Sequence, residues 1–289
     1  MRRENQYFPE KRKEYPIPLR LELWDAQLDF VEAVIRREGS DDFGSTIREK
    51  TEILAGFLKE CANRGIGREE SVHLGEELVT DIVDIFEGSG PEWKRMACDR
   101  IEVSWLELKK LPRVQSPEIR HQVGKLNYAV REYPLSGIDV DLSPFGVREG
   151  DIVLDMHMDA WCRQDPGEEQ ISVGRSLERL TEDLEHMEVE NPEEFEKVKG
   201  VFAISWILDH PAVNRVLKFH VAGQRTDSFN RTSTWTQLVT SDGKIDPKRL
   251  EYLKRNGELQ YKVVAGFMPK EEFMSRFVPD AGVEMAMEE

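Results

Sequence analysis

The segment Gly150–Gln164, which reads GDIVLDMHMDAWCRQ, contains the residues best suited to chemistry. Asp155, His157 and Asp159 alternate with apolar residues, so they share one face of the strand that this pattern predicts. Aspartate and histidine are ordinary metal ligands, and a histidine also carries protons near neutral pH. Three interpretations stay open: the polar side of a half-buried strand, a histidine that transfers protons or binds substrate, and a metal site.

A second group of polar residues interrupts the apolar stretch AISWILDHP, residues 203–211. Ser205 and Trp206 lie within the apolar run, and Asp209 is placed to cap a short helix that has Pro211 in its first turn. The free N–H groups where a strand turns into a helix can hold an anion or a developing oxyanion. Ser205 lacks the flanking glycines of a nucleophile elbow, which argues against a serine hydrolase.

Several familiar signatures are absent from the chain. The sequence contains neither a Walker A motif nor a dinucleotide-binding glycine pattern, and it lacks the kinase motifs and the HExxH zinc helix. Cys61, Cys98 and Cys162 lie far apart without a CxxC pair, so neither a disulfide framework nor a structural zinc site is expected. Because the histidines outside the first segment are scattered singly, a resident metal is not expected.

The first part of the chain carries helical signals. Apolar residues recur at helical spacing in four stretches, which are residues 24–35, 53–61, 69–86 and 91–108. Gly39 and Gly65 are placed to end the first two helices, and Thr46 with Glu49 forms a capping-box pattern ahead of the second. We therefore expect an N-terminal arm over residues 1–20 and a helical bundle over residues 21–112.

The remainder mixes strands with helices. Strands are expected at 126–130, 151–158, 200–208 and 260–269, an irregular strand within 225–240, and helices at 173–187, 210–219 and 248–255. Since strands and helices do not alternate strictly, the pattern predicts an α+β domain over residues 113–275 behind the helical bundle. A frayed tail is expected over residues 276–289.

Five of these segments resemble a known family. In order they read KLNYAVREY, GDIVLDMHM, SVGRSLERLTEDLEHM, VFAISWILDHPAVNRVL and LQYKVVAGFM. Together they are similar to the C-terminal domain of GNAT-like acyltransferases in which a helical N-terminal region precedes the acyltransferase-like domain. The resemblance covers about residues 120–270, and its most specific part is SWILDHP, residues 205–211.

The resemblance implies a fold and an activity. The fold would be a mixed sheet, flanked by helices, that splays open between two central strands. Acetyl-CoA or another acyl-CoA would lie in that opening with an amine acceptor opposite. Acyl transfer to an amine needs a base and an oxyanion donor. By this need and by position, the candidate base is His157 or Asp155, the oxyanion partner is Ser205 or a backbone N–H, and Trp161, Trp206 and Asp209 are candidate substrate contacts.

The charge of the chain limits its partners. The net charge is −16, and residues 165–199 alone hold 12 acidic and 4 basic residues, a net of −8. A chain so acidic repels phosphate backbones, so nucleic acid is not an expected partner. The acidic stretch indicates a solvated helical face or, alternatively, a surface that steers an amine substrate or a basic partner.

The sequence gives no sign of a membrane or of secretion. No apolar stretch approaches the length of a membrane span, and the charged start MRRENQYFPEKRKEYPIP is unlike a secretory signal. We therefore expect a cytoplasmic protein that is an acyl-CoA-dependent N-acyltransferase. The alternatives are a GNAT-shaped binding or scaffold protein without turnover and a metal-dependent hydrolase using Asp155, His157 and Asp159.

Overall fold

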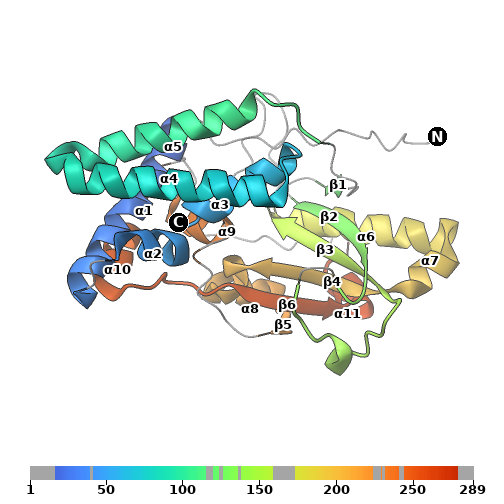
Figure 1. Ribbon diagram of the computed structural model, residues 1–289. Helices are drawn as coiled ribbons and strands as arrows, with labels where there is room; N and C mark the ends of the chain where they lie inside the picture. Colours follow the sequence, from blue (N-terminus) through green and yellow to red (C-terminus); the bar gives the residue numbers. More distant parts are fainter. Residues whose placement is uncertain are drawn as a thin grey trace, which may run out of the picture.

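The fold combines a group of helices with a mixed β-sheet (Figure 1). The structure is a computed structural model that describes residues 17–39, 42–114, 120–123, 126–135, 138–158, 173–223, 229, 232–240 and 244–278. The N-terminal helices are α1 (Ile17–Glu38), α2 (Phe43–Lys50), α3 (Ile53–Asn63), α4 (Arg68–Gly88), the 3₁₀ turn η1 (Gly90–Glu92) and α5 (Trp93–Lys109). In the part of the chain that the structure describes, no helix is long and apolar enough to span a membrane.

The sheet follows in the second half of the chain. Its strands are β1 (Arg120–Val123), β2 (Leu126–Glu132), β3 (Ile152–Met158), β4 (Val198–Ser205), β5 (His220–Val221) and β6 (Val264–Pro269). The helices between and after the strands are α6 (Val173–Glu190), α7 (Pro192–Lys197), α8 (Pro211–Leu217), α9 (Thr232–Trp235), α10 (Pro247–Asn256) and α11 (Lys270–Arg276), with 3₁₀ turns η2 (Ser143–Phe145), η3 (Trp206–Asp209) and η4 (Thr236–Leu238).

The sheet is antiparallel except at its centre. The strand order is β1-β2-β3-β4-β6-β5, and β3 and β4 form the one parallel pair among the described strands. A parallel pair needs a crossover, and α6 with α7 supplies it. In β4, Gly200 is required by close approach, because a Cβ there would lie 2.2 Å from the carbonyl oxygen of Met268 on β6.

Two separate cores cover the two faces of the sheet. On one face, α6, α8 and α11 bury apolar side chains that include Leu154, Met156, Val201, Leu177 and Leu180. The opposite face is covered by the chain between β2 and β3, whose Leu135, Leu142 and Val147 pack on Val153, Phe202 and Phe267. Because side chains alternate along a strand, Asp155 and His157 share the second face with Val153.

Helix α1 connects the helices to the second half of the chain. One side of α1 packs into the bundle through Trp24, Leu28 and Val31. Its other side, which carries Leu23 and Phe30, packs against the segment between β5 and β6. That segment contributes Phe229, Trp235, Leu238, Leu253 and Leu259 to a third core. A helix buried on two sides in this way joins both regions of the molecule.

Most of the expected elements are present, with local differences. The helical expectations for 24–35, 69–86 and 248–255 are confirmed, as are the strands at 126–130 and 151–158. The capping-box expectation for Thr46 is wrong, since Thr46 lies inside α2 and its hydroxyl donates to the carbonyl of Asp42, which caps that helix. The irregular strand expected within 225–240 is wrong for residues 232–238, where α9 and η4 form around the fully buried Trp235, and Val239 makes an isolated antiparallel bridge with Ile245.

Candidate functional site

An ionic cluster of three side chains lies on the second face of the sheet. The carboxylate of Asp155 on β3 is the centre of this cluster, and its side chain is only 3% exposed. Arg131 Nε on β2 lies 2.7 Å from Asp155 Oδ2, and His157 Nε2 lies 3.3 Å from the same oxygen. Arg131 reaches Asp155 diagonally, because the register pairs Arg131 with Val153 and Ala129 with Asp155.

The three side chains differ in their access to water. The His157 side chain is 40% exposed, the Arg131 side chain is 25% exposed, and Asp155 is buried. A buried carboxylate is stable in its charged form only with close partners of opposite charge, which the guanidinium of Arg131 supplies. The cluster therefore presents an accessible imidazole whose Nε2–H tautomer donates to an inaccessible carboxylate. This arrangement can accept a proton and stabilise the resulting cation.

The paired register between β3 and β4 ends before His157. The parallel pairing of β3 with β4 extends from Ile152 to the pair Asp155↔Phe202 and does not include the last residues of either strand. Both strands continue, β3 to Met158 and β4 to Ser205, and both remain paired on their outer sides. The paired register between the two central strands thus ends two residues before His157.

The residues after β4 form a second polar group. Ser205 Oγ accepts a hydrogen bond from the backbone N–H of Ile207 at 3.2 Å, so its side chain caps η3. Trp206 donates from its indole Nε1 to Thr236 Oγ1 at 3.0 Å. Its ring also stacks on Tyr261, with 5.9 Å between the ring centroids. Ser205 and Trp206 are half-buried, and the contacts of Trp206 hold it against the segment before β6.

The expected role of Asp209 as a helix cap is wrong. Asp209 Oδ2 accepts a hydrogen bond from the backbone N–H of Lys262 at 2.9 Å, and the N-cap of α8 is His210, whose side chain makes no capping bond. Because η3 already includes Asp209, the chain turns one residue later than the sequence suggests. Burial, and then the nearby cation Arg249, lower the pKa of His210, so this ring is neutral at pH 7.

The structure brings together some of the predicted residues and separates others. Asp155 and His157 are in contact, whereas Ser205 lies on the opposite face of the sheet from His157, since β4 pairs Phe202 with Asp155. Trp206 and Asp209 form part of the group after β4. The expectations for Asp159, Trp161 and Cys162 lie outside the described residues.

Sequence reasoning missed Arg131 and Asn127. Both share a strand face with Ala129, and the register places Asn127, which is 6% exposed, opposite His157. The signal was present as the alternation of β2, which puts Asn127 and Arg131 on one face. The alternation does not give the register between β2 and β3, and a register shift of one residue would place both side chains on the face away from Asp155 and His157.

The cluster is not arranged as a metal centre. Among the described residues, no group of three or more histidine, cysteine, aspartate or glutamate side chains is placed to hold a metal ion. At Asp155 the position facing the carboxylate is taken by the Arg131 guanidinium, which would repel a cation. The arrangement is suited to moving a proton at His157.

Comparison with known proteins gives no family for this chain. No protein-family model matches it, and neither does any curated protein or solved structure. The functional argument therefore depends on the geometry at the end of β3.

Proposed function

We propose that this chain is an acyl-CoA-dependent N-acyltransferase with a GNAT-like sheet, acting on an amine where β3 and β4 separate. The observation that carries the proposal is the parallel β3–β4 pair. Its pairing ends at Asp155↔Phe202 while both strands continue, and the half-exposed His157 stands beside that point. A sheet that opens between two central strands is what the GNAT resemblance implies.

The opening offers the donor groups that an acyl-CoA needs. Where two strands stop pairing, their facing N–H and C=O groups become free to bond an extended ligand, as at the edge of a sheet. The pantetheine arm of CoA is such a ligand, because it is extended and contains two amides. The stretches Met156–Met158 and Ala203–Ser205 would hold it, with acetyl-CoA or another acyl-CoA as the donor.

His157 would accept the proton that the amine must lose. As the amine nitrogen bonds to the thioester carbonyl carbon, the carbon–sulfur bond breaks, and the proton passes from the nitrogen to His157. The CoA thiolate that leaves then takes up a proton. Asp155 would orient the imidazole and stabilise its cationic form, and the guanidinium of Arg131 would hold the Asp155 carboxylate in position. Asp155 itself is too buried to reach the amine.

The oxyanion donor would come from the backbone of β4. Ser205 is on the face opposite His157, and its Oγ already accepts from Ile207 N–H. The backbone N–H groups beyond Phe202 that face β3 are better placed for the developing negative charge. Trp206 and Asp209, next along the chain, would border the bound substrate.

A scaffold protein of the same shape is the second candidate. The observation that favours it is the acidic surface of α6 and α7, where Glu185, Glu188, Glu193, Glu194 and Glu196 are exposed. Since α6 packs on the face away from His157, this surface would bind a basic partner independently of the opening. The cytoplasm is the proposed location for either function, in agreement with the absence of paired cysteines from the sequence.

Two measurements test the enzyme proposal. The first is the shift in unfolding temperature with CoA and acetyl-CoA, since a ligand bound only by the native state stabilises it by about 2.7 kcal/mol at 100 times its Kd. The second is release of free CoA thiol from acetyl-CoA in the presence of a panel of primary amines. The variant His157→Gln is compared with His220→Gln, which alters another half-exposed histidine paired with a carboxylate, Glu272.

The expected result is stabilisation by CoA and turnover that His157→Gln lowers by about 10²–10⁴-fold, while His220→Gln keeps the wild-type rate. Unchanged turnover in His157→Gln would remove this residue from the mechanism. No stabilisation by either CoA compound, together with capture of a basic peptide that is lost when the exposed glutamates of α6 and α7 become glutamines, would establish the scaffold instead.

A further inference from the structure

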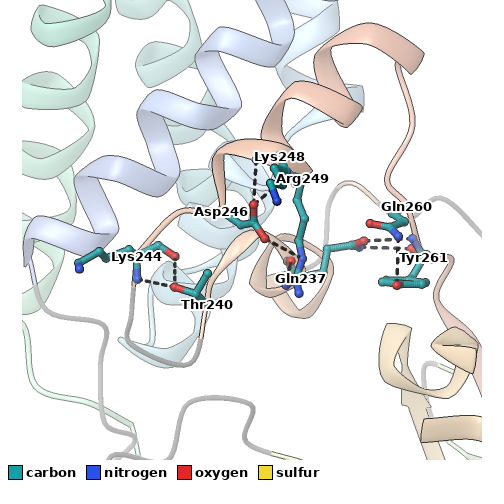
Figure 2. Close-up of polar contacts among 8 residues, drawn as sticks. All are labelled: Gln237, Thr240, Lys244, Asp246, Lys248, Arg249, Gln260 and Tyr261. Carbon is teal, nitrogen blue, oxygen red and sulfur yellow. Dashed lines mark hydrogen bonds and ion pairs between the residues drawn. The ribbon is translucent and has the colours of Figure 1, made fainter. Parts of the chain in front are cut away.

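A buried glutamine, Gln237, fixes the segment before β6 that packs against the chain after β4. Gln237, in η4, is 2% exposed. Its Nε2 donates to the carbonyls of Thr234 at 3.0 Å and Tyr261 at 3.2 Å, and its Oε1 accepts from the backbone N–H of Tyr261 at 3.1 Å. Both amide donors of Gln237 are used, and it binds the Tyr261 backbone at two points (Figure 2).

Tyr261, whose backbone Gln237 binds, contacts the residues that follow β4, and so does its neighbour Lys262. The ring of Tyr261 stacks on Trp206 at 5.9 Å and lies 4.7 Å from the ring of His210. The backbone N–H of Lys262 donates to Asp209 Oδ2 at 2.9 Å. Thr236, next to Gln237, accepts the indole N–H of Trp206. The direction of the chain beyond Ser205 thus depends on the position of Tyr261 and Lys262.

Gln237 is in turn fixed to α10. Its main-chain carbonyl accepts from Arg249 Nη1 at 2.8 Å, and Arg249 Nε lies 3.2 Å from Asp246, the residue that caps α10 (Figure 2). Helix α10 is joined to α1 by the ion pair between Lys254 and Asp29. Through Arg249 and α10, Gln237 is therefore anchored to the N-terminal helices.

The core between α1 and the η4 segment makes this support rigid. Trp235 is fully buried and donates from Nε1 to the carbonyl of Phe229 at 2.7 Å. Phe30 of α1 packs against both rings, at 5.3 Å from Phe229 and 6.0 Å from Trp235. Large aromatic rings packed together bury much apolar surface and move little. The helical region thus supplies a fixed base for the end of β4.

We propose that Gln237 is a positioning residue that sets where the end of β4 lies relative to β3, and so the width of the opening. This inference depends on the proposed acyl-CoA site for its effect on binding. Gln237 contacts neither Asp155 nor His157, so its loss would displace the β4 side of the opening and leave the proton-accepting pair in place. In this proposal the N-terminal helices contribute to the site by fixing the position of the end of β4.

The test replaces Gln237 by methionine, which has similar length without hydrogen-bonding groups. The matched control is Gln260→Met, since Gln260 is an exposed glutamine that donates to the hydroxyl of the same Tyr261. A second variant, Thr236→Val, removes the acceptor of the Trp206 indole and applies if Gln237→Met does not fold. Two readouts are used: the indole N–H signal of Trp206 in NMR, assigned with Trp206→Phe, and the Kd and KM for acetyl-CoA.

In Gln237→Met we expect the Trp206 indole signal to shift and its hydrogen exchange to accelerate. We expect Kd and KM for acetyl-CoA to rise about tenfold, the effect of one or two lost hydrogen bonds, with kcat within about threefold of wild type. Thr236→Val should act similarly, and Gln260→Met should leave both readouts unchanged.

An unchanged Trp206 signal and unchanged acetyl-CoA affinity in a folded Gln237→Met variant would overturn the inference, as would a fall in kcat alone. If wild-type protein does not bind acetyl-CoA but Trp206 responds to Gln237→Met, the positioning of β4 by Gln237 stands and the acyltransferase proposal fails. The two failures are therefore distinguishable.

Discussion

Two aspartates in this molecule, Asp29 and Asp155, are each paired with two basic side chains. Asp29 on α1 contacts Lys94 on α5 and Lys254 on α10, and thereby ties three helices together. Asp155 on β3 contacts Arg131 and His157 within two adjacent strands. Each carboxylate is mostly buried, with 18% of the Asp29 side chain and 3% of the Asp155 side chain exposed.

The difference lies in what the cations can do. Lysine keeps its charge throughout the neutral range, so the Asp29 cluster has one state there and serves to hold α1 between α5 and α10. Histidine changes its charge in that range, and His157 is open to solvent just beyond the last β3–β4 pair. Burial and ion pairing are therefore common to both sites, and the titratable, accessible partner distinguishes the candidate catalytic one.

The largest expected effect comes from removing the charge of Asp155. In Asp155→Asn the imidazolium of His157 loses its stabilising carboxylate, so we expect kcat for acyl transfer to fall by about 10²–10⁴-fold. The equivalent change Asp29→Asn should leave kcat within about twofold of wild type. Steady-state release of CoA thiol measures both, and comparable losses of activity in the two variants would remove the distinction between the sites.

The next effect is on stability, and here Asp29 is the sensitive site. Asp29→Asn leaves Lys94 and Lys254 without their shared carboxylate, which we expect to cost about 1–3 kcal/mol. The lower part of this range applies because the two lysine side chains are 29% and 30% exposed and so are screened. Urea unfolding followed by circular dichroism measures the change, and a variant as stable as wild type would contradict it.

The stability that Asp29 supplies should depend on pH in a definite direction. Burial raises the pKa of Asp29, but hydrogen bonds from Lys254 and Lys94 outweigh it, so the net pKa is below the ordinary value. Its contribution is fully present above the unfolded-state pKa of about 3.9 and is lost as pH falls through the lower folded-state pKa. Burial lowers the pKa of Lys94, but hydrogen bonds to Asp29 and Glu32 outweigh it, so the net pKa is above the ordinary value. The contribution of Lys94 to stability is therefore lost as pH rises through its folded-state pKa.

The contrast between the sites also explains what the sequence could predict. Period-two alternation placed Asp155 and His157 on one face, because that relation is local to β3. The contact of Arg131 with Asp155 could not be predicted, because it depends on the register between β2 and β3. Asp209 was assigned a local capping role by its position before Pro211, whereas its partner is the backbone of Lys262, 53 residues further on.

The same reasoning applies to α9 and η4. Threonines at 232, 234 and 236 are typical of a strand by propensity, so the sequence favoured an irregular strand there. The observed helical turns bury Trp235 against Phe30 of α1, a contact made across about 200 residues. Tertiary packing overrides propensity at this point. By contrast, α4 and α10 were predictable because their apolar spacing and their terminal signals lie within each helix.

A smaller effect is expected from changing Asp25, which lies beside Asp29 on α1. Asp25 lies one turn before Asp29, and burial together with repulsion from Asp29 raises its pKa above the ordinary value. Its charge therefore costs stability at neutral pH, and that cost disappears as pH falls through its folded-state pKa. Since Asp25 is only partly buried and remains in contact with water, its repulsion is screened, and Asp25→Asn should raise stability at pH 7 by no more than about a few tenths of a kcal/mol. In the Asp29→Asn background the gain should shrink, which a double-mutant cycle measures.

The smallest effect concerns the thiol next to this cluster. Burial, and then the negative charges of Asp25 and Asp99, raise the pKa of Cys98 to about 12, and burial also raises the pKa of Cys61. Because the thiolate is the reactive form, neither cysteine should be labelled by a thiol reagent at pH 8 in the native protein, and both should be labelled in concentrated guanidinium. Peptide mapping by mass spectrometry assigns the label to each cysteine. Rapid native labelling of Cys98 would mean that water reaches the interface of α1 with α5, and the Asp29 ion pairs beside it would then be too well screened to hold the helices together.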